Sequence, residues 1–270
     1  MTRSFREITF TAPLTEPMAT DAYYAPDNGA WRLVVIPGTP CNKMLYTRFL
    51  RTAPPGVEVV VISRPGFGKG HEKSVTSFDE QVAAIRPFLE TGKGWPKKNV
   101  VVMGVSYGGE LALKAALDFP DAVAGVVTVA ALIDEPHDYA LTLEAVGRDP
   151  RVIDYVPNRW RKVREEIEAR RAQIGPLMAR FKEIEQPVEV VHGDFDALVP
   201  KSNADTLMAA LGESARLEII PGGTHYLELQ YPRRLHAAVS RVMERAAPPA
   251  WRQPSQAPQE GFSVGRSPSI

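Results

Sequence analysis

A serine on a sharp turn is the residue whose setting points most directly to chemistry. Residues 100–109 read Val-Val-Val-Met-Gly-Val-Ser-Tyr-Gly-Gly, and a helical pattern follows from Glu110. An apolar strand, a Gly-x-Ser-x-Gly turn and a helix form the pattern of a nucleophile elbow, which presents Ser106 at the end of a strand. Gly104 and Gly108 allow the strand and the helix to approach closely. The N–H groups at the start of the helix favour an oxyanion beside the serine. The alternative interpretation is a glycine-rich turn with an idle serine.

A serine hydroxyl is a useful nucleophile at neutral pH only when a base takes its proton. His225 suits that role, because it follows Gly222-Gly223-Thr224 on a loop expected at the end of a strand. The imidazole in turn needs a carboxylate that fixes its tautomer and stabilises its charged form. Asp194 and Asp196 lie on the preceding loop of this kind, and Asp134 follows the strand after the elbow helix. The residues alone leave all three acids open.

The other histidines and the cysteine are assigned structural or surface positions. His192 ends a strand and is expected to pack beneath the site, whereas surface positions are expected for His71, His137 and His236. Cys41 is the single cysteine of the sequence, which excludes an intrachain disulfide and a cysteine metal cluster. We expect it to be a small buried residue.

Apolar stretches that alternate with helical patterns must position these groups. Stretches that are apolar throughout indicate a parallel sheet covered by helices on both faces. In such a sheet, function lies at the carboxyl ends of the strands. The expected strands are residues 31–36, 57–62, 100–105, 123–129, 188–191 and 215–220, and the expected helices are residues 42–52, 77–90, 110–119, 201–211 and 232–245.

The first thirty residues give weaker signals. Residues 8–10 are expected to form a short edge strand, and Ala25-Pro-Asp-Asn-Gly29 is a turn of hairpin type. The glycine-rich loop at residues 63–70 does not have the spacing of a phosphate loop, because Gly68-Lys69-Gly70 leads to His71 rather than to a serine or threonine. We therefore do not expect nucleotide binding there.

The alternation stops at about residue 134. Residues 159–174 form a charged amphipathic pattern, with an apolar stripe at Trp160, Val163, Ile167 and Ile174 and with the charges expected on a solvated outer face. Gly175-Pro176 is expected to separate this helix from a second one at 177–184. The sequence therefore predicts a core at residues 1–133 and 187–246 with a helical cap at 134–186. Residues 247–270, rich in Pro, Ser, Gln and Gly, are expected to be a disordered tail.

Composition restricts the class of protein. The 270 residues include 32 basic and 32 acidic side chains, so no net field favours nucleic acid or an anionic membrane. We do not expect the N-terminal residues to form a signal peptide, and no apolar run of the sequence is long enough for stable membrane insertion. We expect a cytoplasmic protein that acts on a small molecule. The sequence does not predict an oligomeric state.

The chain order Ser106, Asp196, His225 is the order of the α/β-hydrolase fold, and at this point the sequence resembles that superfamily. The resemblance covers about residues 25–245 and includes a helical cap after the sixth strand. It rests on four stretches: Pro37-Gly-Thr-Pro40, Gly104-Val-Ser-Tyr-Gly-Gly109, Gly193-Asp-Phe-Asp-Ala-Leu-Val-Pro200 and Gly222-Gly-Thr-His225.

The resemblance implies roles for individual residues. The spacing from Gly193 to Pro200 selects Asp196 as the acid, which leaves Asp194 to bond the backbone of its own loop. The oxyanion hole is expected from the backbone N–H groups of Tyr107 and Thr39, with possible help from the Thr39 hydroxyl. Pro37 stands where the family usually has histidine.

A second departure from the family pattern lies in the loop after an early strand. The stretch Ser63-Arg-Pro-Gly-Phe-Gly68 carries Ser63 in place of the usual aspartate, and no catalytic role is expected for this loop. Candidate pocket residues are Tyr139, Tyr155 and Trp160, which suit the interior of a helical insertion equally well.

The sequence thus predicts a serine hydrolase that cleaves an ester or related acyl bond through Ser106, His225 and Asp196, without a metal or organic cofactor. Thioesterases, carbon–carbon bond hydrolases and prolyl-aminopeptidase-like enzymes use the same three groups on this fold and remain alternatives. An alternative of another class is a non-catalytic ligand-binding protein. A serine nucleophile disfavours epoxide hydrolases and haloalkane dehalogenases, which have an aspartate at the elbow. Activity is expected to rise with pH as His225 becomes neutral.

Overall fold

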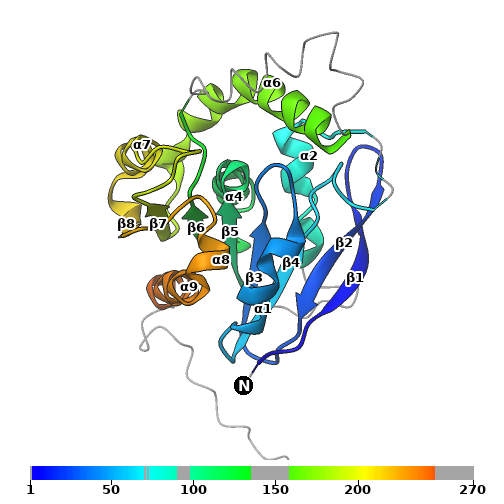
Figure 1. Cartoon of the computed structure of the whole chain (residues 1–270), viewed down its shortest axis with the longest axis horizontal. Helices are drawn as coiled ribbons and strands as arrows, with labels where there is room; N and C mark the ends of the chain where they lie inside the picture. Colours follow the sequence, from blue (N-terminus) through cyan, green and yellow to red (C-terminus); the bar gives the residue numbers. More distant parts are fainter. Residues whose placement is uncertain (1, 70, 72, 90–97, 135–157, 247–270) are drawn as a thin grey trace, which may run out of the picture.

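A mixed, mostly parallel sheet forms the centre of the molecule, as the sequence predicts (Figure 1). In this computed structural model the described residues are 2–69, 71, 73–89, 98–134 and 158–246. They form an eight-stranded sheet in the order β1-β2-β4-β3-β5-β6-β7-β8. The strands are β1 (Arg6–Ala12), β2 (Met18–Ala25), β3 (Trp31–Ile36), β4 (Val57–Ile62), β5 (Asn99–Val105), β6 (Val123–Val129), β7 (Val188–Gly193) and β8 (Ala215–Ile220).

Helices cover both faces of this sheet. Figure 1 shows α2 and α4 on one side and α1, α8 and α9 on the other. The helices are α1 (Thr47–Arg51), α2 (Phe78–Ala83), α3 (Arg86–Leu89), α4 (Tyr107–Asp118), α6 (Asn158–Met178), α7 (Ser202–Leu211), α8 (Leu227–Gln230) and α9 (Pro232–Ala246), and the short 3₁₀ helices are η1 (Lys43–Tyr46), η3 (Phe181–Glu183) and η4 (Gly212–Ser214). Within the described ranges, no helix has the length and apolar character needed to cross a membrane.

The central strands divide their side chains between two apolar cores. Alternate residues of a strand point to opposite faces, so Val34 belongs to the core that includes residues of α2, α4 and α7, whereas Val35 belongs to the core that includes residues of α1, α8 and α9. All six residues of β4 are buried. This double burial explains why these strands read as continuous apolar runs.

The N-terminal region differs from the sequence prediction. The expected edge strand at residues 8–10 is longer and pairs with β2, which the sequence did not predict. The turn at residues 25–29 does not form a hairpin, because β2 pairs antiparallel with β4 and β4 lies between β2 and β3. Asp27 accepts hydrogen bonds from the Gly29 and Gly56 N–H groups and so fixes this crossover.

The described part of the expected cap is one long helix and a short turn. Helix α6 continues through Gly175-Pro176 to Met178, so the predicted break there is wrong. Pro176 lies two residues before the end of the helix, and Ile174 and Leu177 on either side of it are buried. Figure 1 shows α6 across the top of the molecule with α2 and α4 below it. The predicted boundary at residue 134 is the last described residue before a gap. The predicted tail at 247–270 lies outside the described residues.

Candidate active site

Ser106 occupies the sharp turn between β5 and α4. Its backbone has φ 54° and ψ −123°, a conformation that residues other than glycine rarely adopt. Its hydroxyl makes no capping hydrogen bond to α4. A Cβ atom at Gly104 would lie 2.0 Å from the Gly108 carbonyl oxygen, and one at Gly108 would lie 2.1 Å from that of Ile36. These distances confirm the close approach that the glycines were predicted to allow.

The loop after β3 lies directly against the serine. A Cβ atom at Gly38 would be 2.8 Å from the Ser106 Cβ and 3.4 Å from its Oγ. A side chain at Gly38 would therefore collide with the serine. Gly38, the residue before Thr39, thus lies against Ser106 from the loop after β3, whereas Tyr107 follows Ser106 at the start of α4.

Asp196 and His225 meet across two strand-end loops. The Asp196 Oδ2 atom is 2.8 Å from His225 Nδ1, and Oδ1 accepts hydrogen bonds of 2.9 Å from the Leu198 and Val199 N–H groups. Burial alone would raise the pKa of Asp196, but the His225 hydrogen bond and the two backbone bonds lower it below its usual value. Asp196 therefore stays ionised beside the imidazole and holds the proton on Nδ1, which leaves Nε2 as the basic nitrogen.

The two other candidate acids have different contacts. Asp194 does not bond its own loop as expected, since its Oδ1 accepts a 2.7 Å hydrogen bond from the Gly222 N–H on the loop that carries His225. The Asp134 backbone N–H donates to Asn203 Oδ1 at 2.8 Å. Asp196 is thus the candidate acid whose carboxylate contacts His225.

The other histidines occupy more varied positions than predicted. His192 is buried beneath the acid loop, as expected, and its Nε2 donates to the Val199 carbonyl at 2.9 Å. Burial lowers the pKa of His192, so its ring is neutral. His236 was expected at the surface but is 7% exposed, stacks on Phe49 and bonds the Phe49 carbonyl at 3.0 Å. His71 is partly buried and bonds the Ala19 carbonyl. His137 lies outside the described residues.

Arg64 and Glu166 are site residues that the sequence did not predict. The Arg64 guanidinium is fully buried and donates from Nε to the Pro37 carbonyl at 2.9 Å and from Nη2 to the Gly38 carbonyl at 3.0 Å. Both ends of the guanidinium also bond the buried Glu166 carboxylate of α6. Glu166 in turn accepts a 2.6 Å hydrogen bond from the Thr39 hydroxyl.

Glu166 keeps the buried Arg64 guanidinium charged. Burial alone would lower the pKa of Arg64, but the charge and hydrogen bonds of Glu166 raise it above its usual value. The prediction that the charges of α6 face solvent is therefore wrong for the face that carries Lys162, Glu166 and Arg170, all of which are buried. The four-residue spacing of these charged residues places them on one side of the helix, but the same spacing is typical of exposed ion pairs.

The loop at residues 63–68 contacts a carboxylate on a neighbouring strand. Ser63 replaces the family's usual aspartate, and its hydroxyl donates to Asp21 Oδ1 of β2 at 2.6 Å. The Lys69 N–H donates to the other oxygen of Asp21 at 3.2 Å. A neighbouring strand thus provides the negative charge that the loop itself does not carry. Cys41 beside it is buried, as predicted.

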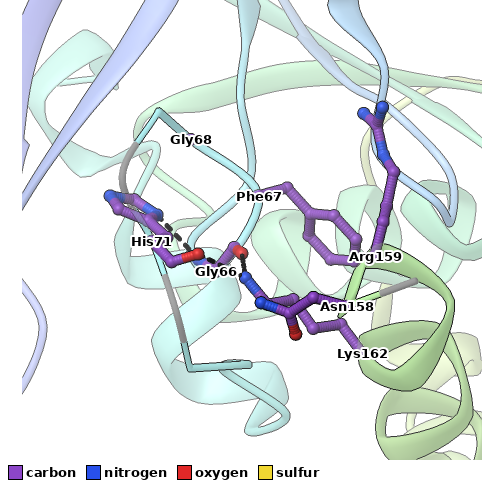
Figure 2. Close-up of a pocket in the computed structure, with 7 residues that line it drawn as sticks. All are labelled: Gly66, Phe67, Gly68, His71, Asn158, Arg159 and Lys162. Carbon is purple, nitrogen blue, oxygen red and sulfur yellow. Dashed lines mark hydrogen bonds between the residues drawn. The ribbon is translucent and has the colours of Figure 1, made fainter. Parts of the chain in front are cut away.

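The expected pocket residues are only partly covered by the structure. Tyr139 and Tyr155 lie outside the described residues, and Trp160 is 48% exposed at the start of α6. A cavity of about 290 Å³ lies between the 66–71 loop and the first turn of α6 (Figure 2), lined by Gly66, Phe67, Gly68, His71, Asn158, Arg159 and Lys162. Ser106, Asp196 and His225 do not line this cavity.

The described residues contain no group of three or more His, Cys, Asp or Glu side chains arranged to hold a metal ion. The candidate site consists instead of a strained serine, a histidine–carboxylate pair and two loop backbones. A family model for the alpha/beta hydrolase family matches residues 33–238, which is most of the chain. The chain belongs to the alpha/beta hydrolase family.

This hydrolase is also similar to a curated protein over part of its length. It is 28% identical over 113 residues to the pimeloyl-[acyl-carrier protein] methyl ester esterase of Aliivibrio salmonicida. The matched region is 42% of this chain and 41% of that protein. The chain thus matches less than half the length of this relative.

Solved structures share the fold of the hydrolase over most of both chains. The peroxisomal alpha-beta-hydrolase Lpx1 from Saccharomyces cerevisiae superposes with a TM-score of 0.69 at 13% identity and covers 97% of this chain and 94% of that one. A bromoperoxidase from Bacillus anthracis gives 0.67 at 18% identity, with 88% and 100% covered. A thermophilic esterase from Thermogutta terrifontis gives 0.64 at 16% identity, with 89% and 99% covered. At these identities the likeness shows the fold.

Proposed function

We propose that this hydrolase is an esterase that cleaves small-molecule esters with Ser106 as nucleophile, His225 as general base and Asp196 as the acid that orients it. The observation that carries the proposal is the 2.8 Å contact between Asp196 and His225, which joins the loops after β7 and β8. Both loops leave the same edge of the parallel sheet as the Ser106 turn, because β5, β6, β7 and β8 run in one direction.

The proposed reaction proceeds through an acyl-enzyme. The Ser106 oxygen attacks the ester carbonyl carbon while its proton passes to His225 Nε2. The negative charge that develops on the carbonyl oxygen is stabilised by the N–H groups of Thr39 and Tyr107. The imidazolium then gives its proton to the departing alcohol as the carbon–oxygen bond breaks. Water, deprotonated by His225, releases the acid and restores Ser106.

An ester substrate is favoured by the similarity to the pimeloyl-[acyl-carrier protein] methyl ester esterase, whose name specifies a methyl ester. The match covers less than half of either chain, so the identity of the acyl group is a separate question. Thioester, carbon–carbon and aminoacyl substrates use the same three groups. The substrate panel therefore includes one compound of each of these types.

The test combines covalent labelling with a substrate panel. A fluorophosphonate probe is expected to label the folded wild-type chain at Ser106, and the Ser106→Ala variant is expected to lose both labelling and turnover. Ser202→Ala, which removes an exposed serine at the start of α7, is the matched control and should behave as the wild type. Equal turnover by Ser106→Ala would exclude Ser106 as the nucleophile.

The panel identifies the scissile bond. It contains chromogenic esters from short to long acyl chains, one thioester, one proline anilide and one vinylogous diketone, each at matched concentration. We expect the ester to give the highest kcat/KM. Highest turnover of another member would transfer the proposal to that bond type, and a ligand that binds without labelling or turnover would support the non-catalytic alternative.

A further inference from the structure

The buried face of α6 is charged rather than apolar. Lys162, Glu166 and Arg170 are 5%, 0% and 1% exposed, respectively. Residues four apart lie above one another on one side of a helix, so these three side chains form a single row, which we call the polar face of α6. Each of the three has hydrogen-bond partners in the core. This row docks the helix onto the loops after β3, β4 and β6 and onto α4.

Glu166 is the member of the polar face that reaches the loop beside the serine. Its Oε2 atom accepts the 2.6 Å hydrogen bond from Thr39 Oγ1 and a 3.1 Å bond from Arg64 Nη2. Its Oε1 atom accepts from Arg64 Nη1 and, at 3.4 Å, from Gln81 Nε2. Because a carboxylate only accepts, the single hydroxyl proton of Thr39 is directed at Glu166. That hydroxyl is then not a donor to an oxyanion, contrary to the possibility left open by the sequence.

The contact of Arg64 with Gly38 sets the direction of a neighbouring N–H. The Gly38–Thr39 peptide is trans, and in a trans peptide the carbonyl and the following N–H point in opposite directions. Arg64 Nη2 holds the Gly38 carbonyl at 3.0 Å. The Thr39 N–H must therefore point away from Arg64. The same Gly38 backbone lies against the Ser106 side chain, so a rotation of this peptide would move the N–H relative to the serine.

The polar face also contacts the element that carries the second donor. Arg170 Nε bonds Glu110 Oε2 of α4 at 2.8 Å, and Arg170 Nη2 bonds the Leu132 and Ile133 carbonyls. Helix α4 begins at Tyr107, whose N–H is the other proposed donor. Glu166 and Arg170, one turn apart, thus attach one helix to both arms of the oxyanion hole.

We propose that Glu166 is a positioning residue for the oxyanion hole, which fixes the Gly38–Thr39 peptide directly through the Thr39 hydroxyl and indirectly through Arg64. This inference rests on the proposed function, since it concerns the same site. Glu166 does not touch the substrate. It sets the orientation in which the Thr39 N–H meets the charge that develops on the carbonyl oxygen.

The first test is the Glu166→Gln variant, which keeps the shape of the side chain and removes its charge. We expect kcat for a short chromogenic ester to fall about 10- to 100-fold, because a small displacement of a catalytic donor is felt in the transition state. KM is expected to change less than about threefold, since the ground-state ester depends little on this donor. The labelling rate with a fluorophosphonate should fall in parallel with kcat.

Lys162→Met is the matched control on the same helix. Lys162 lies one turn before Glu166, is comparably buried, and donates to the Gly66 and His71 carbonyls at 2.7 and 2.6 Å, across the cavity of Figure 2. Its loss weakens the docking of α6 without touching Thr39. We expect an unchanged kcat with a lower melting temperature. An equal fall of kcat in both variants would reduce Glu166 to a stabilising residue and overturn the proposal.

Thr39 provides a second pair of variants that leaves the Arg64–Glu166 ion pair intact. Thr39→Ser keeps the hydroxyl that bonds Glu166 and should retain kcat within about twofold, whereas Thr39→Val is expected to lose about tenfold. Equal activity of the two variants would contradict a role for the contact between the Thr39 hydroxyl and Glu166, even if Glu166→Gln did not fold. Combining Thr39→Val with Glu166→Gln should cost less than the product of the single effects.

The proposed function and this inference fail in different ways. If Ser106→Ala retains turnover and labelling, the serine mechanism itself is excluded. If Ser106→Ala is inactive while Glu166→Gln matches the Lys162→Met control in kcat, the hydrolase mechanism stands and the positioning role of Glu166 is wrong.

Discussion

Tyr107 has separate roles for its backbone and its side chain. Its N–H at the start of α4 is a proposed oxyanion donor, whereas its ring lies under Arg64, with the guanidinium carbon 4.8 Å from the ring centre. The phenol oxygen is buried and finds no hydrogen-bond partner among the described residues. Burial raises the pKa of this phenol well above its usual value, so it stays protonated. The hydroxyl therefore costs free energy without taking part in the proposed reaction.

Removal of that hydroxyl should separate the two roles. We expect Tyr107→Phe to keep kcat within about twofold and to increase the free energy of unfolding by about 1 kcal/mol, because a buried unpaired polar group is removed. Urea unfolding and ester turnover measure the two quantities. A large loss of activity in Tyr107→Phe would mean that the phenol itself acts in the reaction.

Asp196 is the proposed acid of the site, and its Oδ2 atom lies 2.8 Å from His225 Nδ1. Asp196→Asn keeps the size of the side chain but favours the wrong histidine tautomer, so kcat is expected to fall roughly 10³- to 10⁴-fold. Asp194→Asn on the same loop, whose carboxylate bonds Gly222 instead, should remain within about tenfold of the wild type. If the two variants lost activity equally, the loop as a whole rather than the Asp196 carboxylate would be responsible.

The sequence predicts Ser106, Asp196 and His225 as site residues because each lies in a short motif at the end of an apolar stretch. Their signal is local, so a single sequence carries it. The direction of the Thr39 hydroxyl could not be recognised, because its partner Glu166 lies 127 residues away. Residue type and spacing identify which groups are available, but long-range contacts decide where their protons point.

Among the elements, α6 shows how a periodic pattern can be assigned to the wrong face. Its charged residues repeat at the spacing of an exposed helix, and Trp160 was placed on the buried stripe. In the structure Trp160 is half exposed and the buried residues include Lys162, Glu166 and Arg170. A buried charge and an exposed charge look alike in a sequence, since the difference lies in the partner that each one meets.

The Arg64–Glu166 pair yields a prediction for stability. Arg64→Met leaves a buried carboxylate without its cation and should lower the free energy of unfolding by about 3–5 kcal/mol. The double variant Arg64→Met with Glu166→Leu replaces both charges by apolar groups and should regain most of that loss, while activity stays low. Urea unfolding of both variants measures this; a double variant no more stable than Arg64→Met would contradict it.

Strand β2 was missed for a related reason. Thr20 and Asp21 interrupt its apolar pattern, yet both are buried. The Thr20 hydroxyl donates to the Ser63 carbonyl at 3.1 Å, and Asp21 accepts the Ser63 hydroxyl at 2.6 Å. Polar residues that pair across strands read as a loop when their partners are unknown. The central strands, whose side chains are apolar on both faces, were predicted with nearly the observed boundaries.

At the scale of the whole molecule, His236 connects two elements on one face of the sheet. It lies on α9, stacks on Phe49 of α1 with ring centres 4.0 Å apart, and bonds the Phe49 carbonyl. Burial lowers the pKa of His236 from 6.5 to about 4. The ring is therefore neutral in the folded chain at neutral pH, and its protonation requires that this contact opens.

This burial predicts a dependence of stability on pH. Between about pH 6.5 and 4 the unfolded chain binds a proton at His236 that the folded chain does not. The contribution of the neutral His236 ring to the free energy of unfolding is therefore fully present above pH 6.5. It is lost as the pH falls toward 4, by about 3 kcal/mol at most. His236→Gln keeps a donor for Phe49 without a titrating ring. The free energy of unfolding of this variant should fall less steeply over that range; parallel curves would contradict the assignment.

The mostly parallel sheet and its two covered faces followed from the alternation of apolar runs and helical patterns. The path of the chain at the N-terminal edge did not, because the turn at residues 25–29 is compatible with a hairpin or a crossover. The crossover is selected by the pairing of β2 with β4, which buries Ala22 and Ala25. A turn sequence specifies a local bend, whereas the sheet as a whole decides which strand comes next.

The polar face of α6 also limits how the length of the chain can vary. A single inserted or deleted residue between Lys162 and Arg170 would turn one part of the helix by about 100° relative to the other. A helix held by apolar contacts can absorb part of such a change by repacking, but here at least one charge would be moved away from its partner. The four-residue spacing must therefore be kept for all three side chains to meet their partners.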